Sequence, residues 1–336
     1  MRYVLGVDGG NSKTLAVVVD ERGSVLGLGR SGNSNHQGIG LEAAMREVRG
    51  AADTALQNAA IDSSSLSAAC CALAGADLPE DFDALNPALA RLQLAPLVEL
   101  DNDSAAALRA GTDSPDAVVV VWGAGTNGAG RNKAGAKIRL PALGSISGDW
   151  GGGGDFGRDA IWFVARAHDG RGRPTVLTDL VLNALGLSDV DEMIRRLYLG
   201  QLSSVQIIEL APLVFQAADA GDPVASQLVV RGGEEVATTA RALLGRLGLL
   251  ESAAQVVLAG GMFRAEAPLF MHIILRALAE MAPHARVVRP DVEPAVGAAF
   301  LALNLLGLPV DATVRERARR SYQQLSLRRA GDVGAS

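Results

Sequence analysis

Both halves of the chain open with the same pattern of short strands and glycine-containing turns, and this repetition limits the possible folds more than any other feature. An apolar run at residues 3–7 ends in Asp-Gly-Gly and is followed by apolar runs at 15–19 and 24–28. A second strongly apolar run, at 117–122, ends in the Gly-rich segment 123–127 and leads into another predicted hairpin. Short runs separated by such turns are typical of antiparallel meanders. We interpret the repetition as an internal duplication, which predicts an α/β protein with two lobes and a cleft between them.

Helical and strand patterns fill the rest of each half. Apolar residues recur at helical spacing in residues 42–60, and the apolar run at 66–74 predicts a buried strand. We place an N-terminal lobe at residues 1–114 and a C-terminal lobe at 115–309, with a last helix at 310–330 that could join the first lobe. Further strands are expected at 97–100, 256–258 and 286–288, further helices at 104–110, 268–281, 293–306 and 313–327, and a mainly helical stretch at 156–250.

The charge and hydropathy of the 336 residues exclude several classes of partner. A net charge of -6 argues against nucleic acid, because phosphate backbones are bound through Lys and Arg. ATP can still be bound locally, through backbone N–H groups and a magnesium ion. The N-terminus, MRYVLGVDGG, does not resemble a signal peptide, and no apolar run reaches the roughly eighteen residues of a membrane span. We therefore expect a cytoplasmic protein with no nucleic-acid or membrane partner.

The cysteines and histidines predict neither a disulfide framework nor a metal cluster within one chain. Cys70 and Cys71 are adjacent in an apolar run and are poorly placed to bridge each other. The four histidines are far apart and lack the spacing of metal ligands. One of them, His36, follows Asn35 in a polar loop before the first helix, where it could touch a substrate.

Two glycine-rich turns are candidates for binding phosphate. In residues 8–14, Gly9 and Gly10 follow a strand and could aim backbone N–H groups at an anion, while Asp8 could hold magnesium directly or through water. An ordinary hairpin turn is the alternative. Residues 123–128 match the dinucleotide fingerprint G-x-G-x-x-G, but that fingerprint requires a helix immediately afterwards, and a turn follows here. We interpret this segment as a second phosphate-binding hairpin that faces the first.

Asp103 stands between a predicted strand and a predicted helix. This place suits a helix N-cap, and it also suits a general base that accepts a proton from a substrate hydroxyl. Asp101 is the rival candidate for the base. Residues 148–158 form the most glycine-dense stretch, which predicts a flexible or ligand-adjacent loop rather than a core element. A disordered linker is the alternative for that stretch.

The order and spacing of these motifs resemble the BadF/BcrA ATPase family. The motifs that carry the resemblance lie at residues 8–14, 35–36, 73–77, 101–103, 123–127, 148–149 and 260–261. The family includes N-acetylglucosamine kinase and belongs to the fold group of actin, hexokinase and Hsp70. The resemblance implies a duplicated, two-lobed actin-like ATPase fold of the ribonuclease H-like type, with a mixed sheet and flanking helices in each lobe and with nucleotide and sugar in the cleft.

The resemblance also implies roles for individual positions, with Asp103 as the catalytic base. Asn35, Gly75, Asp103 and Asp149 are similar to sugar-contacting positions of the family, and His36 and Gly148 beside them complete the predicted pocket. The positions similar to the ATP-binding loops are Gly9, Gly10, Asn11, Ser12, Lys13 and Thr14 in the first turn, Gly123, Gly125, Thr126 and Asn127 in the second, and Gly260, Gly261 and Met262 in an adenosine loop. Two departures lie near the expected pocket, where Pro-Ala-Leu-Gly at 141–144 replaces the usual G-G-W-G and Trp150 replaces the usual Glu.

We therefore expect an ATP-dependent kinase that uses Mg²⁺ and phosphorylates N-acetylglucosamine or a related amino sugar, at the 6-hydroxyl. The alternative within the same family is an ATPase that drives a partner enzyme, whose relatives hold an iron–sulfur cluster between subunits through cysteines. A third hypothesis is a binding regulator without turnover, although no helix-turn-helix segment is left over to bind DNA. Related kinases suggest a homodimer.

Overall fold

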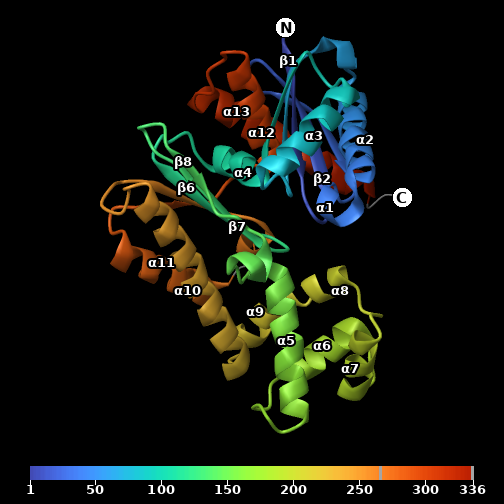
Figure 1. The fold of residues 1–336 in the computed structure, drawn as a ribbon, viewed down its shortest axis with the longest axis vertical. Coiled ribbons are helices and arrows are strands. Elements are labelled where there is room, and N and C mark those ends of the chain that lie inside the picture. Colours follow the sequence, from blue (N-terminus) through green and yellow to red (C-terminus); the bar gives the residue numbers. More distant parts are fainter. Residues whose placement is uncertain (265–266, 334–336) are drawn as a thin grey trace. The chain divides into compact units, whose positions relative to one another are not determined.

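The computed structural model describes residues 1–264 and 267–333, which belong to two compact units. The first unit comprises residues 1–113 together with the chain from residue 288 onward, and the second comprises Ser114–Val287. Each unit contains one five-stranded sheet with helices packed against it (Figure 1). Within the described ranges, no helix combines the length and the apolar character that crossing a membrane requires.

The sheet of the first unit has the strand order β3-β2-β1-β4-β5. β1 (Tyr3–Gly9) pairs antiparallel with β2 (Thr14–Asp20), which pairs antiparallel with β3 (Val25–Ser31). On its other side β1 pairs parallel with β4 (Leu66–Leu73), which pairs parallel with β5 (Leu97–Asn102). The predicted meander is confirmed, and the three parallel strands bring their carboxyl ends to one edge of the sheet.

The sheet of the second unit repeats this topology. β6 (Ala117–Trp122) takes the place of β1, between antiparallel β7 (Thr126–Arg131) and parallel β9 (Gln255–Ala259). β8 (Lys137–Arg139) lies beyond β7, and β10 (Arg286–Val288) lies beyond β9. Since the order β8-β7-β6-β9-β10 matches β3-β2-β1-β4-β5 strand for strand, the predicted duplication is confirmed.

Helices cover both faces of the first sheet. They are α1 (His36–Ile39), α2 (Leu41–Ala59), α3 (Pro79–Leu92), α4 (Asp103–Gly111), α12 (Pro294–Leu305) and α13 (Ala312–Val333), with a 3₁₀ turn at Ser63–Ser65. α2 and α3 pack on the face that carries Leu5 and Val7, whereas α4 and α12 pack on the face that carries Val4. α12 lies very close to β1, because a Cβ at Gly6 would lie only 2.2 Å from the carbonyl oxygen of Ala295. Glycine at position 6 therefore permits this contact.

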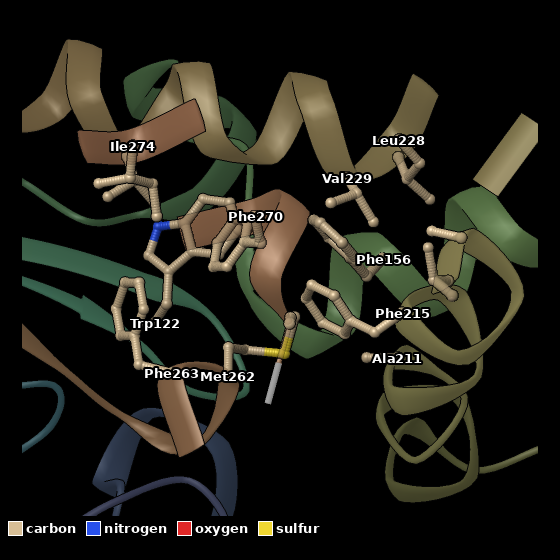
Figure 2. Packing of buried hydrophobic residues seen from close by; sticks show 14 of the residues in the cluster. Trp122, Phe156, Ala211, Phe215, Leu228, Val229, Met262, Phe263, Phe270 and Ile274 are labelled. Atoms are coloured by element: carbon tan, nitrogen blue, oxygen red, sulfur yellow. The ribbon is translucent and has the colours of Figure 1, made fainter. Parts of the chain in front are cut away.

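An aromatic cluster forms the centre of the second unit. The helices of this unit are α5 (Gly152–His168), α6 (Leu177–Leu185), α7 (Val190–Tyr198), α8 (Ser204–Ile208), α9 (Ala211–Asp219), α10 (Pro223–Arg246) and α11 (Pro268–Met281), with 3₁₀ turns η2 (Gly144–Ser147) and η3 (Gly261–Arg264). Trp122, at the end of β6, lies 5.8 Å from Phe156 and 5.6 Å from Phe270 between ring centroids (Figure 2). Phe156 stacks on Phe215 at 5.5 Å. These contacts anchor the end of β6 and hence the turn that follows it.

Two expectations from the sequence differ from the structure. Residues 288–309, expected in the C-terminal lobe, lie in the first unit, because α12 packs against β1 and α4. The glycine-dense stretch was predicted to be a loop outside the core, and this is wrong for residues 152–158, which form the first two turns of α5 with residues 152–154 buried. The alternative, a disordered linker, is wrong for the same reason. Gly157 gives a physical reason, since a Cβ there would lie 1.9 Å from the carbonyl oxygen of Ile207 in α8. Glycine at position 157 therefore allows α5 and α8 to pack closely.

Candidate active site

The carboxyl ends of β1, β4 and β5 form the candidate site of the first unit. Their register aligns Asp8 with Ala72, and Ala72 with Asp101, so the two aspartates share a sheet face with one strand between them. Asp103 follows as the first residue of α4. Ligands of α/β proteins bind at this end of parallel strands, and the predicted metal ligand and both candidate bases lie there.

The turn between β1 and β2 is the first predicted phosphate loop. Gly10 N donates to Lys13 O at 2.9 Å and closes the turn, and Asn11 and Ser12 are exposed at its tip. Thr14 differs from these, because its side chain is fully buried and its hydroxyl donates to a carbonyl of the loop after β3 at 2.7 Å. The Thr14 hydroxyl thus fixes the turn to that loop, while the other predicted donors lie nearer the surface.

Three of the residues predicted to contact a sugar lie together. Asn35 Oδ1 caps α1 by accepting from Gln37 N at 3.0 Å, and Asn35 Nδ2 donates to Asn11 Oδ1 at 2.7 Å. Gly75 has a φ of +84° and passes so close that a Cβ would lie 2.5 Å from Asn35 Oδ1 and 3.2 Å from His36 Nδ1. Position 75 therefore requires glycine both for its backbone conformation and for space.

The helix that carries Asp103 is capped by its neighbour. Asn102 Oδ1 accepts from Ser104 N at 3.1 Å, so Asn102 is the N-cap and Asp103 is the first helical residue. The expected N-cap was therefore wrong by one position. A carboxylate in the first turn of a helix is stabilised by the helix dipole. Asn102 Nδ2 also donates to Asp77 Oδ1 at 3.0 Å, which joins α4 to the turn after β4.

The second unit has glycine-rich segments at the carboxyl ends of β6 and β9. Gly123 N donates to Gly125 O at 2.9 Å and closes the turn after β6. The first turn of α5 binds the same segment, because Gly153 N donates to Gly123 O and Gly154 N donates to Ala124 O, each at 2.8 Å. Among the described residues, no atom lies within 4 Å of a Cβ built at Gly123 or Gly125. One side of this predicted phosphate turn is therefore open.

The predicted adenosine loop follows β9. Gly260 has a φ of +110°, and a Cβ there would lie 2.2 Å from the carbonyl oxygen of Trp122. The side chain of Met262 is buried beside the aromatic cluster (Figure 2), which leaves its backbone rather than its side chain to contact a nucleotide. Thr126 and Asn127 are the first two residues of β7 and are partly buried.

Gly148 and Asp149 lie in the loop that leads to α5. Gly148, with a φ of +80°, ends the η2 turn. Asp149 N donates to Gly144 O at 3.0 Å, and the Ser147 hydroxyl donates to the Asp149 carboxylate. The Asp149 side chain is therefore oriented by its own loop.

Trp150, one of the two departures from the family pattern, is fixed by residues of α5 and α10. The guanidinium of Arg231 lies 3.6 Å from the centroid of the Trp150 ring, which is a cation–π contact, and Arg231 pairs with Asp159 at 3.3 Å. Burial raises the pKa of Asp159, and the charge of Arg231 opposes this rise. Burial also raises the pKa of Glu235, again opposed by Arg231. The Trp150 side chain thus anchors the loop that carries Asp149.

Three polar residues of the first unit were not identified from the sequence: Ser34, Asp81 and Asn102. Ser34 Oγ and His36 Nδ1 are buried and have no hydrogen-bond partner within the described ranges. Asp81 Oδ1 lies 3.2 Å from His36 Nε2, and Asp81 Oδ2 accepts from Leu78 N at 2.7 Å. Of the three, Asn102 alone carried a usable signal, because asparagine directly before a helix is a common N-cap.

The metal chemistry of the described residues is limited. Within them, no group of three or more His, Cys, Asp or Glu is arranged to hold a metal ion. This finding does not bear on Mg²⁺, which keeps several waters and is bound through one or two carboxylates plus substrate phosphates. Cys70 and Cys71 are fully buried in β4, and burial raises the pKa of Cys71 to about 12. Neither thiol is therefore a ready metal ligand.

Two units with the same five-strand order define a duplicated, ribonuclease H-like protein of the actin-like ATPase fold. Similar solved structures include a proposed N-acetylglucosamine kinase from Chromobacterium violaceum, with a TM-score of 0.74, 25% identity and coverage of 90% of this chain and 99% of that chain. The fold is also that of a ROK family glucokinase from Streptomyces griseus, with a TM-score of 0.59, 20% identity and coverage of 90% and 99%.

The sequence matches the model of the BadF/BadG/BcrA/BcrD ATPase family over residues 5–302, and the chain belongs to this family. It is 28% identical over 314 residues to an N-acetyl-D-glucosamine kinase from Dictyostelium discoideum, covering 89% of this chain and 97% of the relative. It is 29% identical over 261 residues to an N-acetylmuramic acid/N-acetylglucosamine kinase from Clostridium acetobutylicum, covering 78% and 85%. The family predicted from the ordered motifs is confirmed.

Proposed function

We propose that this protein is an ATP-dependent sugar kinase that phosphorylates N-acetylglucosamine or a related amino sugar at the 6-hydroxyl. The observation that carries the proposal is the contact of Asn35, His36 and Gly75 at the sheet edge where Asp103 begins α4. Such an edge can offer a sugar both polar contacts and a carboxylate. The two relatives named as N-acetylglucosamine kinases support the same activity.

We propose that the protein promotes phosphoryl transfer mainly by positioning the sugar hydroxyl and the ATP phosphates. Such transfer depends on alignment and charge neutralisation more than on a strong base. Asp103 orients the attacking hydroxyl and accepts its proton. We propose that the phosphates of ATP bind at two places. These are the exposed tip at Asn11 and Ser12 and the open side of the turn at residues 123–125. Mg²⁺, when bound with ATP, would neutralise charge on the transferred group, and Asp8 offers the hard carboxylate oxygen that this ion prefers.

The choice of an amino sugar rests on the relatives, one of which is named for N-acetylmuramic acid as well as N-acetylglucosamine. Trp150 and residues 141–144 depart from the family pattern near the predicted pocket. Because Trp150 anchors the loop that carries Asp149, we expect these departures to affect which substituents on the sugar are accepted. A test of substrate must therefore include sugars larger and smaller than N-acetylglucosamine.

A partner-driving ATPase of the same family is the alternative. Its known relatives hold an iron–sulfur cluster between subunits through cysteine thiolates. Here Cys70 and Cys71 are both 0% exposed within β4, and no other cysteine exists in the sequence. This burial favours the kinase. Iron analysis of anaerobically purified protein separates the two, because bound iron in near-stoichiometric amount would favour the activator.

The deciding experiment is a coupled assay of ADP release with ATP and Mg²⁺. N-acetylglucosamine, glucosamine, N-acetylmuramic acid, glucose and gluconate are compared at equal concentration. We expect strong stimulation by one amino sugar, and a product whose phosphorus couples to the protons on carbon 6 in the NMR spectrum. Steady ATP hydrolysis that no sugar changes would reject the kinase and favour the partner-driving ATPase.

We further propose a homodimer in the cytoplasm, where ATP is available. The expectation of a dimer comes from the related kinases. Light scattering coupled to size-exclusion chromatography measures the mass directly, and a single species of one chain's mass, 34.7 kDa, would contradict it.

A further inference from the structure

The helix that follows Asn35 is not held in place by hydrophobic packing. α1 has only four residues, and none of them is buried. A helix this short has little stability of its own. Polar contacts must therefore fix the position of Asn35, which caps α1, and of His36, which begins it.

Two of these contacts come from the β1–β2 turn and the strand after it. Asn35 Nδ2 donates to Asn11 Oδ1 at 2.7 Å, and the Thr14 hydroxyl holds the start of the loop at Gly32. Both fix the loop from the side of the predicted phosphate turn. The opposite side of the loop needs a separate anchor.

That anchor is Asp81, the third residue of α3. Asp81 Oδ1 lies 3.2 Å from His36 Nε2 and accepts from Gln37 Nε2 at 3.4 Å. The side chains of His36 and Asp81 are only 14% and 13% exposed, so water screens this contact weakly. One carboxylate oxygen thus faces both residues that follow Asn35.

The other oxygen of Asp81 is held by backbone. Asp81 Oδ2 accepts from Leu78 N at 2.7 Å and from Asp77 N at 3.1 Å, in the turn that also carries Gly75. Burial raises the pKa of the Asp81 carboxyl, but these two N–H groups, the hydrogen bond from Gln37 and the charge of His36 together outweigh burial, so the pKa lies below its ordinary value. The carboxylate is therefore charged and fixed in direction.

The same turn is joined to the helix of the predicted base. Asp77 Oδ1 accepts from Asn102 Nδ2 at 3.0 Å, and Asn102 Oδ1 caps α4 just before Asp103. A continuous set of polar contacts therefore runs from His36, through Asp81 and the turn after β4, to the start of α4.

We propose that Asp81 is a positioning residue of the sugar pocket, which holds the loop of Asn35, the turn of Gly75 and the start of α4 in one arrangement. The proposal rests on the proposed sugar kinase activity for its kinetic consequence. Asp81 itself is assigned no contact with substrate. It acts through the residues that have been predicted to make such contacts.

The test is Asp81→Asn, with Asp83→Asn as its matched control. Asn at position 81 keeps the shape of the side chain, and its single carbonyl oxygen can still accept from the backbone N–H groups of the turn. Its amide nitrogen then faces His36, where a carboxylate stood before. Asp83 lies on the same helix and is exposed, so Asp83→Asn removes the same charge without touching the loop.

We expect Asp81→Asn to raise the KM for the sugar about tenfold, which corresponds to about 1.4 kcal/mol. The KM for ATP and the melting temperature should stay near those of the wild type, as should all values for Asp83→Asn. A sugar KM within about twofold of the wild type, or an equal change in Asp83→Asn, would overturn the proposal. A merely structural role would instead lower the melting temperature and leave the KM of the folded fraction unchanged.

A spectroscopic measurement tests the effect of Asp81 on His36 without relying on enzyme activity. A carboxylate beside Nε2 favours a proton on that nitrogen, and long-range ¹H–¹⁵N spectra of histidine-labelled protein distinguish the two neutral tautomers and the imidazolium. With four histidines in the chain, His36 is assigned by its loss in His36→Gln. We expect the wild type to carry the proton on Nε2 and Asp81→Asn to lose that preference. An unchanged His36 signal overturns the proposal even if no sugar is phosphorylated, whereas a changed signal with an inactive wild type rejects the kinase alone.

Discussion

Gly75→Ala should damage the protein more than its backbone conformation alone explains. Position 75 has a φ of +84°, a conformation that costs a residue with a Cβ about 1–2 kcal/mol. A Cβ there would also lie 2.5 Å from Asn35 Oδ1, so Asn35 must move. Its hydrogen bonds to Gln37 N and Asn11 Oδ1 would then weaken, at about 0.5–1.5 kcal/mol each. We expect a total loss of about 2–5 kcal/mol.

Gly307→Ala is the control for the backbone term. Gly307 belongs to the same unit and has a φ of +69°, but within the described ranges no atom lies within 4 Å of a Cβ built there. This variant should lose only the roughly 1–2 kcal/mol of the backbone term. For a unit of this size, each kcal/mol lowers the melting temperature by about 2–4 °C.

Calorimetry and sugar kinetics together test the reasoning. Gly75→Ala should melt lower than Gly307→Ala and should raise the KM for the sugar, while Gly307→Ala keeps the kinetics of the wild type. If the two variants melt at the same temperature and share the sugar KM of the wild type, then the contact between Gly75 and Asn35 does not shape the pocket in solution.

Three further outcomes follow from the site and its surroundings. Asp103→Asn should lower kcat about 10²–10⁴-fold with ATP binding retained by calorimetry, and near-normal turnover would remove Asp103 as the base. Burial raises the pKa of Cys71 to about 12, so the folded protein keeps a proton that the unfolded chain releases above about pH 8.5. The contribution of this thiol to the free energy of unfolding is therefore fully present below that pH and is lost as the pH rises toward 12. In urea titrations, the free energy of unfolding of Cys71→Ala should fall less at alkaline pH than that of the wild type. Arg231→Met should weaken the anchoring of Trp150 by about 0.5–2 kcal/mol and change its fluorescence, and an unaltered emission spectrum would argue against the cation–π contact.

The topology was predictable because it depends on local signals. The runs at residues 3–7 and 117–122 are apolar enough to be buried strands, and each ends in glycines that permit a tight turn. The repetition of this signal predicted the duplicated sheet, which has the same strand order in both units.

The place of α12 was not predictable, because it depends on a long-range contact. Nearly all of this helix is apolar, so its pattern marks no single face, and its sequence position suggests the second unit. The missing side chains of two glycines explain where α12 packs. A Cβ at Gly6 would lie 2.2 Å from the carbonyl oxygen of Ala295, and one at Gly297 would lie 2.1 Å from that of Ala106 in α4. Only the folded structure reveals that these glycines face backbone.

The sequence suggested the glycines and acids of the candidate site but not the residues that hold them in place. Asn35, Gly75 and Asp103 were expected to act together, and the first two are in contact. Asp81 carried no signal in the sequence, because its contact with His36 joins positions 45 residues apart. The high glycine content of residues 152–158 also led to the wrong prediction of a loop, because glycine there permits close packing of a helix.

The two hydrogen bonds from Gly153 and Gly154 to Gly123 and Ala124 have a mechanical consequence. They connect the turn after β6 to the first turn of α5 through main-chain atoms, in addition to the contact between the side chains of Trp122 and Phe156. We therefore expect a displacement of the first turn of α5 to move the turn at residues 123–125 with it. Substitutions of surface side chains on this helix leave both hydrogen bonds intact, whereas a proline at position 153 or 154 would remove one of them.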